Sequence, residues 1–372
     1  MISYRTANSK VAATSIAACQ ELHAKNGVFG KCLLPIVLLS AMTLLVSQLA
    51  SATRLNAQDR GTQVSSVGFW SHTNGPTRNS LAGVSGTAID NAWAVGIFGT
   101  ILHWDGSSWQ SVTSPTSNHL TSVDIVTAGD AWAVGAHGTI LHWAGGLWNT
   151  VASPTSQNLA AVDMLASDYG WAVGTYGTIL HWNGASWQSV ASPTSAHLTS
   201  VSAISTTMAW AVGVSSADIR LGSGGVILRW DGNSWGKQDV PYDMYSVAAL
   251  SQDYARASGT FWFEVDPPTT RLMHWDGSSW QVDASVQDLG TPYSIALVSE
   301  DEGWAVGSRG TILQWDGVSW QAAASPTGNH LFSIEMIASD KGWAVGANGT
   351  ILRYWVPTNW TYLTTVLKDF GP

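Results

Sequence analysis

The sequence predicts an all-β fold, a seven-bladed β-propeller of four-stranded blades that follows an N-terminal signal or anchor segment. Three observations predict it. A Trp-rich unit of about 39 residues recurs along the chain, and each copy contains four short strand patterns separated by turn residues. Only 11% of the residues are charged, whereas Gly (37) and Trp (22) are abundant, a composition typical of β-structure with many tight turns.

The first 52 residues read as a signal peptide or an N-terminal anchor. Lys10, Lys25 and Lys31 precede an uncharged run over 33–46, and the small residues at 50–52 resemble a cleavage site. The run is shorter than the roughly 20 residues that span a bilayer, which favours cleavage, whereas the long region before it suits a retained anchor. We therefore expect an extracytoplasmic protein, secreted or membrane-associated through this segment alone. The predicted divisions are 1–52 signal or anchor, 53–66 linker, 67–366 propeller and 367–372 tail.

Composition excludes several functions. Cys19 and Cys32 both lie in the predicted signal segment, so the rest of the chain has no thiol for a disulfide, a thiolate metal site or Cys catalysis. The formal net charge is −9, and loss of the basic N-terminal segment makes the remainder more acidic. Nucleic acid is not an expected partner, because its binding requires basic residues that neutralise phosphates.

Seven copies of the repeat can be counted. The sequence Trp-Ala-Val-Gly begins at Trp93, Trp132, Trp171, Trp210, Trp304 and Trp343. The wide gap between Trp210 and Trp304 contains a degenerate copy, in which residues 253–258 take the place of Asp-Ala-Trp-Ala-Val-Gly. In the second copy we expect strands over 120–125, 131–135, 139–143 and 148–152.

Both ends of the repeat region offer an additional outer strand. The segment from Trp70 matches the one from Trp109, so an N-terminal strand could complete the last blade and close the ring. Trp355 and Trp360 match Trp104 and Trp109 as well, so a C-terminal strand is the alternative. The sequence does not distinguish the two.

Nearly all Trp residues occupy repeat positions, and only Trp262 stands outside the pattern. We expect the repeated Trp side chains to pack between blades, where large aromatic area contributes most. This interpretation removes most of the Trp residues from consideration as sugar-stacking platforms.

The unit Gly-Trp-Ala-Val-Gly-x-x-Gly-Thr-Ile-Leu followed by Asp-Gly-x-x-Trp, clearest over 303–320, resembles the bacterial-neuraminidase-type (BNR) repeats of the photosystem II stability and assembly factor family. The resemblance covers roughly residues 67–366. It implies an exported propeller that binds a membrane-protein intermediate, and a turn related to the Asp-box. The Asp residues of those turns, Asp105, Asp231, Asp276 and Asp316, are expected to brace them. The family's binding role is associated with a basic patch, and this chain is acidic with scattered Arg.

Little in the sequence indicates catalysis, and no cofactor is expected. Sialidases share this propeller type but need three converging Arg and a Tyr/Glu pair, and no Arg recurs at one repeat position. A two-carboxylate glycosidase stays open, with Glu264 as the candidate acid. His103, His142, His181 and His274 share one repeat position, but neighbouring blades lie about 10 Å apart, too far for shared zinc ligation. We expect them to form interblade hydrogen bonds. Asp124, Asp163 and Glu335 share a position on the innermost strand and would line the central channel, as solvated carboxylates or as a weak cation site.

The loop between the second and third strands varies at its tip while its flanks stay constant. In the fourth and fifth copies it lengthens to 214–224 and 259–269. Propeller geometry places these loops on one face with the connections to the next blade, and we call this the loop face. Loops on a rigid scaffold commonly carry function, although relaxed drift of exposed tips would give the same pattern. The candidate binding residues are Phe98, His119, His137, Tyr176, His197, Arg220, Trp262, Arg309, His330 and Asn348.

Three functions follow from this reading. The first is non-catalytic binding or assembly of a protein partner, or of an extracellular glycan, by the loop face. The second is a glycoside hydrolase or lyase that uses carboxylates in the same depression. The third is a purely structural envelope protein, for which changes at the loop tips have no effect.

Overall fold

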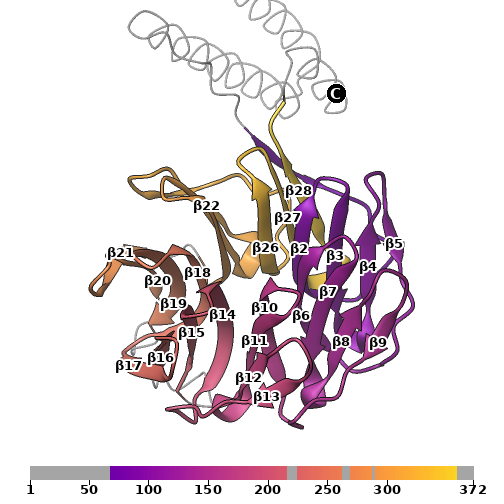
Figure 1. Cartoon of the computed structure of the whole chain (residues 1–372). Helices are drawn as coiled ribbons and strands as arrows, with labels where there is room; N and C mark the ends of the chain where they lie inside the picture. Colours follow the sequence, from indigo (N-terminus) through magenta and orange to yellow (C-terminus); the bar gives the residue numbers. More distant parts are fainter. Residues whose placement is uncertain (1–67, 216–223, 262–268, 287–289, 358–372) are drawn as a thin grey trace, which may run out of the picture. The chain divides into compact units, whose positions relative to one another are not determined.

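The computed structural model describes residues 68–215, 224–261, 269–286 and 290–357. They form seven four-stranded antiparallel sheets, the blades of a β-propeller (Figure 1), as the sequence predicts. Within these ranges no helix is long and apolar enough to span a membrane.

Blades 1 to 3 are nearly identical. Blade 1 contains β2 (Leu81–Ala88), β3 (Asn91–Gly96), β4 (Ile101–Trp104) and β5 (Trp109–Ser111). Blade 2 contains β6 (Leu120–Thr127), β7 (Asp130–Gly135), β8 (Ile140–Trp143) and β9 (Trp148–Thr150). Blade 3 contains β10 (Leu159–Ala166), β11 (Tyr169–Gly174), β12 (Ile179–Trp182) and β13 (Trp187–Ser189). The predicted strands of the second copy are confirmed to within two residues at each end.

Blades 4 and 5 have longer strands, and blade 6 returns to the common pattern. Blade 4 contains β14 (His197–Ser205), β15 (Met208–Val214), β16 (Gly225–Trp230) and β17 (Trp235–Val240). Blade 5 contains β18 (Asp243–Ser251), β19 (Tyr254–Phe261), β20 (Thr269–Trp275) and β21 (Trp280–Val286). Blade 6 contains β22 (Pro292–Ser299), β23 (Glu302–Gly307), β24 (Ile312–Trp315) and β25 (Trp320–Ala322).

The N-terminal strand closes the ring. Blade 7 contains β26 (Leu331–Ala338), β27 (Lys341–Gly346), β28 (Ile351–Trp355) and, as its outer strand, β1 (Phe69–His72). β1 pairs with β28 in antiparallel register, with Trp70 opposite Tyr354 (Figure 1). The alternative C-terminal strand around Trp360 lies outside the described residues.

Interblade packing of Trp, expected from the repeat, is confirmed. Trp93 of blade 1 is 1% exposed, and its ring centroid lies 4.8 Å from that of Trp143 and 5.1 Å from that of Trp148 in blade 2. The same arrangement joins blades 2 and 3, 3 and 4, 4 and 5, and 7 and 1. Each blade therefore buries its apolar face on the next, which is how a repeat too thin for a core of its own becomes stable.

Side chains of the innermost strands connect the blades around the channel. The innermost strand of each sheet has an unpaired edge, whose N–H groups need acceptors. Ser122 Oγ accepts the N–H of Val162 in the next blade at 3.3 Å. Equivalent serines do the same at four other interfaces: Ser200 to Val247, Ser246 to Ile295, Ser294 to Ile334 and Ser333 to Val84.

The degenerate copy is a regular blade, but the expected alignment is wrong by one residue. β19 places Arg256 opposite His274, as β7 places Trp132 opposite His142. Arg256, and not Ala255, therefore stands at the position of the repeated Trp. Tyr254 correspondingly stands at the position of Asp130.

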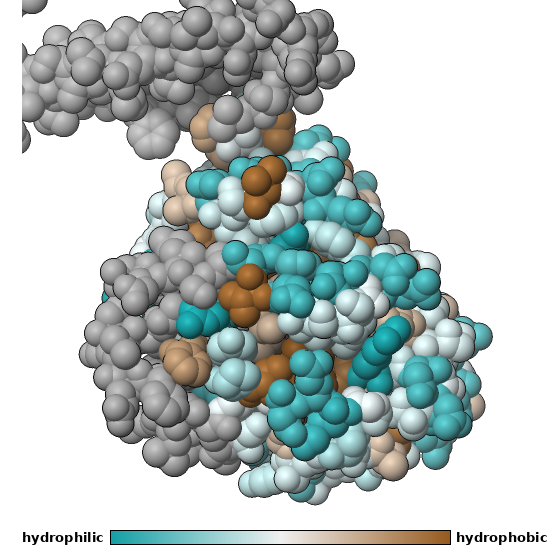
Figure 2. Space-filling view, turned by 90° about the vertical axis from the view of Figure 1, so that its left-hand side faces the viewer, coloured by the Kyte–Doolittle hydropathy of each residue, from teal (hydrophilic) through white to brown (hydrophobic). Residues whose placement is uncertain are grey.

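The outer side of the blades shown in Figure 2 is mainly hydrophilic, with apolar residues scattered singly among polar ones. Single exposed apolar residues are normal on protein surfaces and indicate no binding site.

Candidate binding surface

The loop face is built from short hairpin tips with a common framework. In blade 1, η1 (Ile97–Gly99) is a single 3-10 turn between β3 and β4. The Thr100 hydroxyl donates to the Ile97 carbonyl at 2.7 Å and accepts from Asn79 Nδ2 at 2.9 Å. Equivalent turns are η2 (Ala136–Gly138), η3 (Thr175–Gly177), η5 (Ser308–Gly310) and η6 (Ala347–Gly349).

The middle residue of each tip has a left-handed backbone. Phe98, His137, Tyr176, Arg309 and Asn348 have φ between 55° and 57°, and these are the positive-φ non-glycine residues of the described chain. This conformation costs an L-residue about 1–2 kcal/mol, and Gly or Asn tolerates it best. Phe98 and Tyr176 are nevertheless large and are 66% and 63% exposed, so burial of their rings does not offset the cost.

The glycine after each middle residue is required by space as well as by backbone angle. Gly99 has φ +67°, and a Cβ added there would lie 1.9 Å from the Thr116 carbonyl oxygen. The tip therefore packs tightly against the connection to the next blade. This contact fixes the backbone of the tip, and the Phe98 side chain is exposed at its end.

Predicted residues of adjacent blades meet at the tips. His119 Nδ1 accepts the Phe98 N–H at 3.1 Å, and the two ring centroids are 5.2 Å apart. The rings of Tyr176 and His197 also lie close together, with centroids 4.9 Å apart. The structure thus joins four of the predicted residues in two aromatic pairs, each formed by a tip and the His before the first Leu of the next inner strand.

The other tips are supported by residues that the sequence reading did not include. The His137 N–H donates to Asn158 Oδ1 at 2.9 Å, and the Asn348 N–H donates to Ser80 Oγ at 3.3 Å. The Arg309 tip has the same backbone, and its side chain is exposed. Arg220 and Trp262, predicted in the two long loops, and Glu264, the candidate acid, lie outside the described residues.

An aromatic patch at the channel mouth was missed by the sequence reading. Tyr245, Tyr293 and Phe332 lie near the starts of the innermost strands β18, β22 and β26, and all three are partly exposed. The centroid of Tyr293 lies 6.0 Å from those of both Tyr245 and Phe332. The exposed His330 ring stacks on Phe332 at 6.2 Å. Comparison of the repeats column by column could have found it, because the other four blades have Ala or Thr there (Ala82, Thr121, Ala160 and Thr199).

Two of the three channel carboxylates, Asp124 and Asp163, take part in interblade hydrogen bonds. Asp124 Oδ2 accepts the Met164 N–H at 2.7 Å, and Asp163 Oδ2 accepts the Ala203 N–H at 2.5 Å. Desolvation by burial raises the pKa of Asp124, and raises that of Asp163 to about 7 with help from the Asp124 charge. Burial and these two carboxylates raise the pKa of Glu335 to about 8. Asp124 and Asp163 therefore contribute to interblade contacts, and both are also partly exposed.

The repeated His side chains do not form the expected interblade hydrogen bonds. His103 Nε2 is 2.9 Å from Asn91 Oδ1, and His142 Nε2 is 2.8 Å from Asp130 Oδ1, in both cases within one blade. The His142 ring stacks on Trp132 at 4.1 Å. The expectation failed because partners on the adjacent strand lie closer than the next blade. In the described ranges no cluster of three or more His, Cys, Asp or Glu could hold a metal ion.

The turn Asp residues brace their turns, as expected. Asp105 Oδ1 accepts the N–H groups of Ser107 and Ser108 at 2.8 and 2.9 Å and the Ser107 hydroxyl at 2.7 Å. These hydrogen bonds, led by that of the hydroxyl, lower the pKa of Asp105 to about 2. Asp231, Asp276 and Asp316 accept equivalent backbone N–H groups.

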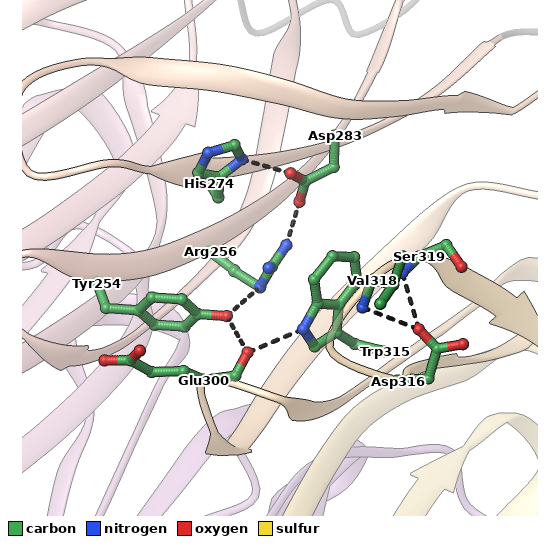
Figure 3. Close-up of polar contacts among 9 residues, drawn as sticks. All are labelled: Tyr254, Arg256, His274, Asp283, Glu300, Trp315, Asp316, Val318 and Ser319. Carbon is green, nitrogen blue, oxygen red and sulfur yellow. Dashed lines mark hydrogen bonds and ion pairs between the residues drawn. The ribbon is translucent and has the colours of Figure 1, made fainter.

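Blade 5 replaces the interblade Trp with a buried charged network (Figure 3). The Arg256 guanidinium lies 3.6 Å from the ring centroid of Trp315 in blade 6, in the place of a Trp ring. It pairs with Asp283, which also pairs with His274, and its Nε donates to Tyr254 Oη at 2.8 Å. Because Arg256 and Asp283 are 4% and 9% exposed, this network is part of the blade interface and is not an open site.

The face opposite the loops has a groove of about 750 Å³ between blades 4 and 5. Its lining includes Met208, Arg229 and Leu250, and one edge is formed by the turn at Asp231. None of the predicted binding residues that the structure describes lines it. The groove is therefore separate from the loop face.

Comparison with known proteins shows the fold. No protein-family model and no curated protein matches the chain. Among solved structures, "YCF48 bound to D1 peptide" is 18% identical with a TM-score of 0.61 and covers 78% of this chain and 97% of its own. YCF48 from Cyanidioschyzon merolae is 18% identical with a TM-score of 0.59 and covers 78% and 99%. The WD40 propeller domain of Doa1 is 12% identical with a TM-score of 0.61 and covers 80% and 98%. At these identities the chain is shown to share the seven-bladed propeller architecture of these structures, and its place in the photosystem II assembly factor family stays a prediction.

Proposed function

We propose that this chain is a non-catalytic propeller that binds an extended segment of a protein partner on its loop face. One observation carries the proposal: bulky, exposed side chains occupy left-handed positions at the tips, where Gly or Asn would fold at lower cost. Strain that the fold does not need is found preferentially at functional sites. The exposed rings of Phe98 and Tyr176, each beside a His ring, are suited to contact with a ligand.

A peptide fits this surface because the aromatic patch at the channel mouth lies on the same face as the tips. Tyr and Phe rings provide large contact area for little loss of side-chain entropy and are typical anchors of protein interfaces. The solved structure of YCF48 with a D1 peptide adds support, since that protein has the same architecture. The same rings would also stack on sugars, so a glycan is the alternative ligand to test.

The described carboxylates support a non-catalytic role. Asp124 and Asp163 accept backbone N–H groups of the next blade, and Asp105 and its equivalents accept those of their own turns. A glycosidase needs two carboxyl groups facing a substrate across about 5–10 Å. The hydrogen bonds of these Asp side chains account for their presence without a substrate.

The test screens the full-length chain against a random-peptide display library and a glycan array, beside a Phe98→Asn/Tyr176→Asn variant. Asn already occupies the left-handed tip position at Asn348, so the variant is expected to fold. Val318→Asn, a change of an 84% exposed apolar residue on the opposite face, is the control. We expect the wild type and the control to select related peptides and the tip variant to bind them at least about tenfold more weakly.

Equal binding by all three proteins would place the site elsewhere. Selection of glycans alone would replace the protein partner with a carbohydrate. We further propose that the protein is exported, which the uncharged run over 33–46 supports. Recovery of the full-length, uncleaved chain from the cytoplasmic fraction of cells that express it would contradict export.

A further inference from the structure

Blade 5 buries several oxygen atoms that have no hydrogen-bond partner in the described chain. Asp243, at the start of β18, is 2% exposed, and neither of its carboxylate oxygens has a partner. Ser258 Oγ and Thr260 Oγ1, both on β19, are also without partners, and these residues are 0% and 1% exposed. Burial of unpaired polar groups is expensive, and each such group in a folded protein needs an explanation.

The sheet register places these side chains together. Asp243 and Thr260 are directly opposite each other in the β18–β19 ladder, and Thr260 is opposite Thr270 of β20. Directly opposed residues have Cβ atoms about 4.5–5.5 Å apart on one face of the sheet. Ser258 is two residues from Thr260 and therefore shares that face. Thr270, 1% exposed, adds a further buried hydroxyl, which donates to the Gly290 carbonyl oxygen.

Of Asp243, Ser258 and Thr260, Ser258 is specific to blade 5. The residue at the position of Ser258 is Val in the six other blades (Val95, Val134, Val173, Val212, Val306 and Val345). In blade 2, Val134 packs in an apolar cluster with Leu159 and Val162 of the next blade. Blade 5 thus replaces an apolar interblade contact with hydroxyl groups and adds a carboxylate beside them.

We propose that Asp243, Ser258 and Thr260 bind an alkali-metal cation at the interface of blades 5 and 6. The donors are all oxygen, which hard cations prefer. The ladder brings together a single carboxylate, and none of the ion pairs among the described residues includes Asp243. A monovalent ion leaves such a site neutral, whereas a divalent ion would leave a net positive charge in a buried environment.

The site is tested by the thermal stability of the full-length chain in NaCl, KCl, CaCl₂ and choline chloride at one ionic strength. Choline is too large for a buried site. We expect the Tm in NaCl or KCl to exceed that in choline chloride by about 2–4 °C, because a ligand that binds only the folded state stabilises it. Broadening of the ²³Na NMR line by the protein gives a second readout that does not depend on unfolding.

Two variants test the assignment. Asp243→Asn removes the charge, and Ser258→Val restores the residue of the other blades, so the latter is expected to fold. Both should abolish the difference between salts and the ²³Na broadening, whereas Asp253→Asn, an exposed Asp of the same blade, should retain them. Equal Tm values in all four salts, the same difference in all variants, or a response to CaCl₂ alone would overturn the proposal.

Discussion

At the scale of single residues, the loop tips keep one backbone conformation while the exposed side chain differs from tip to tip. Five tips share one left-handed residue and one following glycine, yet the left-handed residue is Phe, His, Tyr, Arg or Asn. The glycine cannot vary, because the backbone of the next connection lies against it. The residue before it points into solvent and can change with little effect on the fold, so this position is suited to determine ligand specificity.

Adjacent residues of one tip should therefore respond in opposite ways to substitution. Tyr176→Gly relieves a left-handed L-residue, and we expect the free energy of unfolding to stay equal or to rise by about 0.5 kcal/mol. Gly177→Ala places a Cβ 1.9 Å from the Thr194 carbonyl oxygen at φ +70°, and we expect a loss of about 2 kcal/mol or more. Urea unfolding measures both. If Tyr176→Gly lowered the free energy of unfolding as much as Gly177→Ala, the inference that residue 176 is free to vary and Gly177 is not would be contradicted.

The channel carboxylates should make stability depend on pH. Burial and two neighbouring carboxylates raise the pKa of Glu335 from 4.5 to about 8, so the folded state holds a proton that the unfolded state releases. Folding stability should therefore fall as the pH rises from about 4.5 to about 8. Glu335→Gln removes the part of this dependence that comes from Glu335, whereas Asp163, whose pKa is raised to about 7, keeps its own. We expect the variant to be more stable than the wild type at pH 8, with a smaller difference at pH 5.

Urea titrations at several pH values measure this effect, and Asp253→Asn, which changes an exposed carboxylate, is the control. Parallel stability curves for Glu335→Gln and the wild type between pH 5 and pH 8 would show that folding does not raise the pKa of Glu335.

At the scale of the elements, the network of Arg256, Asp283 and His274 in blade 5 occupies the place that a Trp ring fills at the other blade interfaces. A charge left unpaired in an interface is strongly destabilising, whereas apolar replacement of a whole buried pair is often neutral. Asp283→Ala should lower the free energy of unfolding by about 3 kcal/mol, because Arg256 remains buried. Addition of Arg256→Trp should recover most of this loss, since Trp fills the same position in the six other blades. Asp239→Ala, an exposed ion-pair partner, should change stability by less than about 0.5 kcal/mol.

Denaturant unfolding of the single and double variants measures the coupling between Arg256 and Asp283. A double variant no more stable than Asp283→Ala would mean that the blade 5 interface has adapted to the Arg side chain and no longer accepts a Trp.

The strands could be predicted because turn residues and the Trp positions mark each of them. The sequence alignment of the degenerate copy is wrong by one residue. This copy lacks Trp-Ala-Val-Gly, so the alignment rests on Asp253 alone, and Asp253 belongs to the turn before the strand. The tips of the candidate site were predictable from variation between constant flanks. The patch of Tyr245, Tyr293 and Phe332 could also have been found by comparing the repeats column by column, but it lies inside a strand pattern, where aromatic residues normally indicate core.

Asp243 could not be recognised from sequence for a different reason. It is the first residue of β18, and a polar residue at the end of a strand is typically exposed. Only the sheet register shows that two buried hydroxyl groups lie beside it. Contacts between strands that are separated by loops of variable length depend on the three-dimensional arrangement and not on local pattern.

At the scale of the whole molecule, stability depends on closure of the ring. Each blade buries its apolar face on the next, so an open ring would expose one face of the first blade and one of the last. β1 completes blade 7, where Trp70 is 7% exposed and its ring centroid lies 5.6 Å from that of Trp304 and 5.2 Å from that of Tyr354. The first strand and the last blade are thus held by the same aromatic contact that joins the other blades.

Two equivalent substitutions distinguish the ends of the chain. Trp70→Ala removes a buried ring from the closing contact, and we expect it to lower the free energy of unfolding by about 3–5 kcal/mol. Trp360→Ala changes the matching Trp of the C-terminal alternative, and we expect a change within about 0.5 kcal/mol, because β1 already fills the outer position of blade 7. Both are measured by urea unfolding of the full-length chain. A large loss for Trp360→Ala with none for Trp70→Ala would mean that the C-terminal strand closes the ring, since only the strand that seals blade 7 can carry this stability.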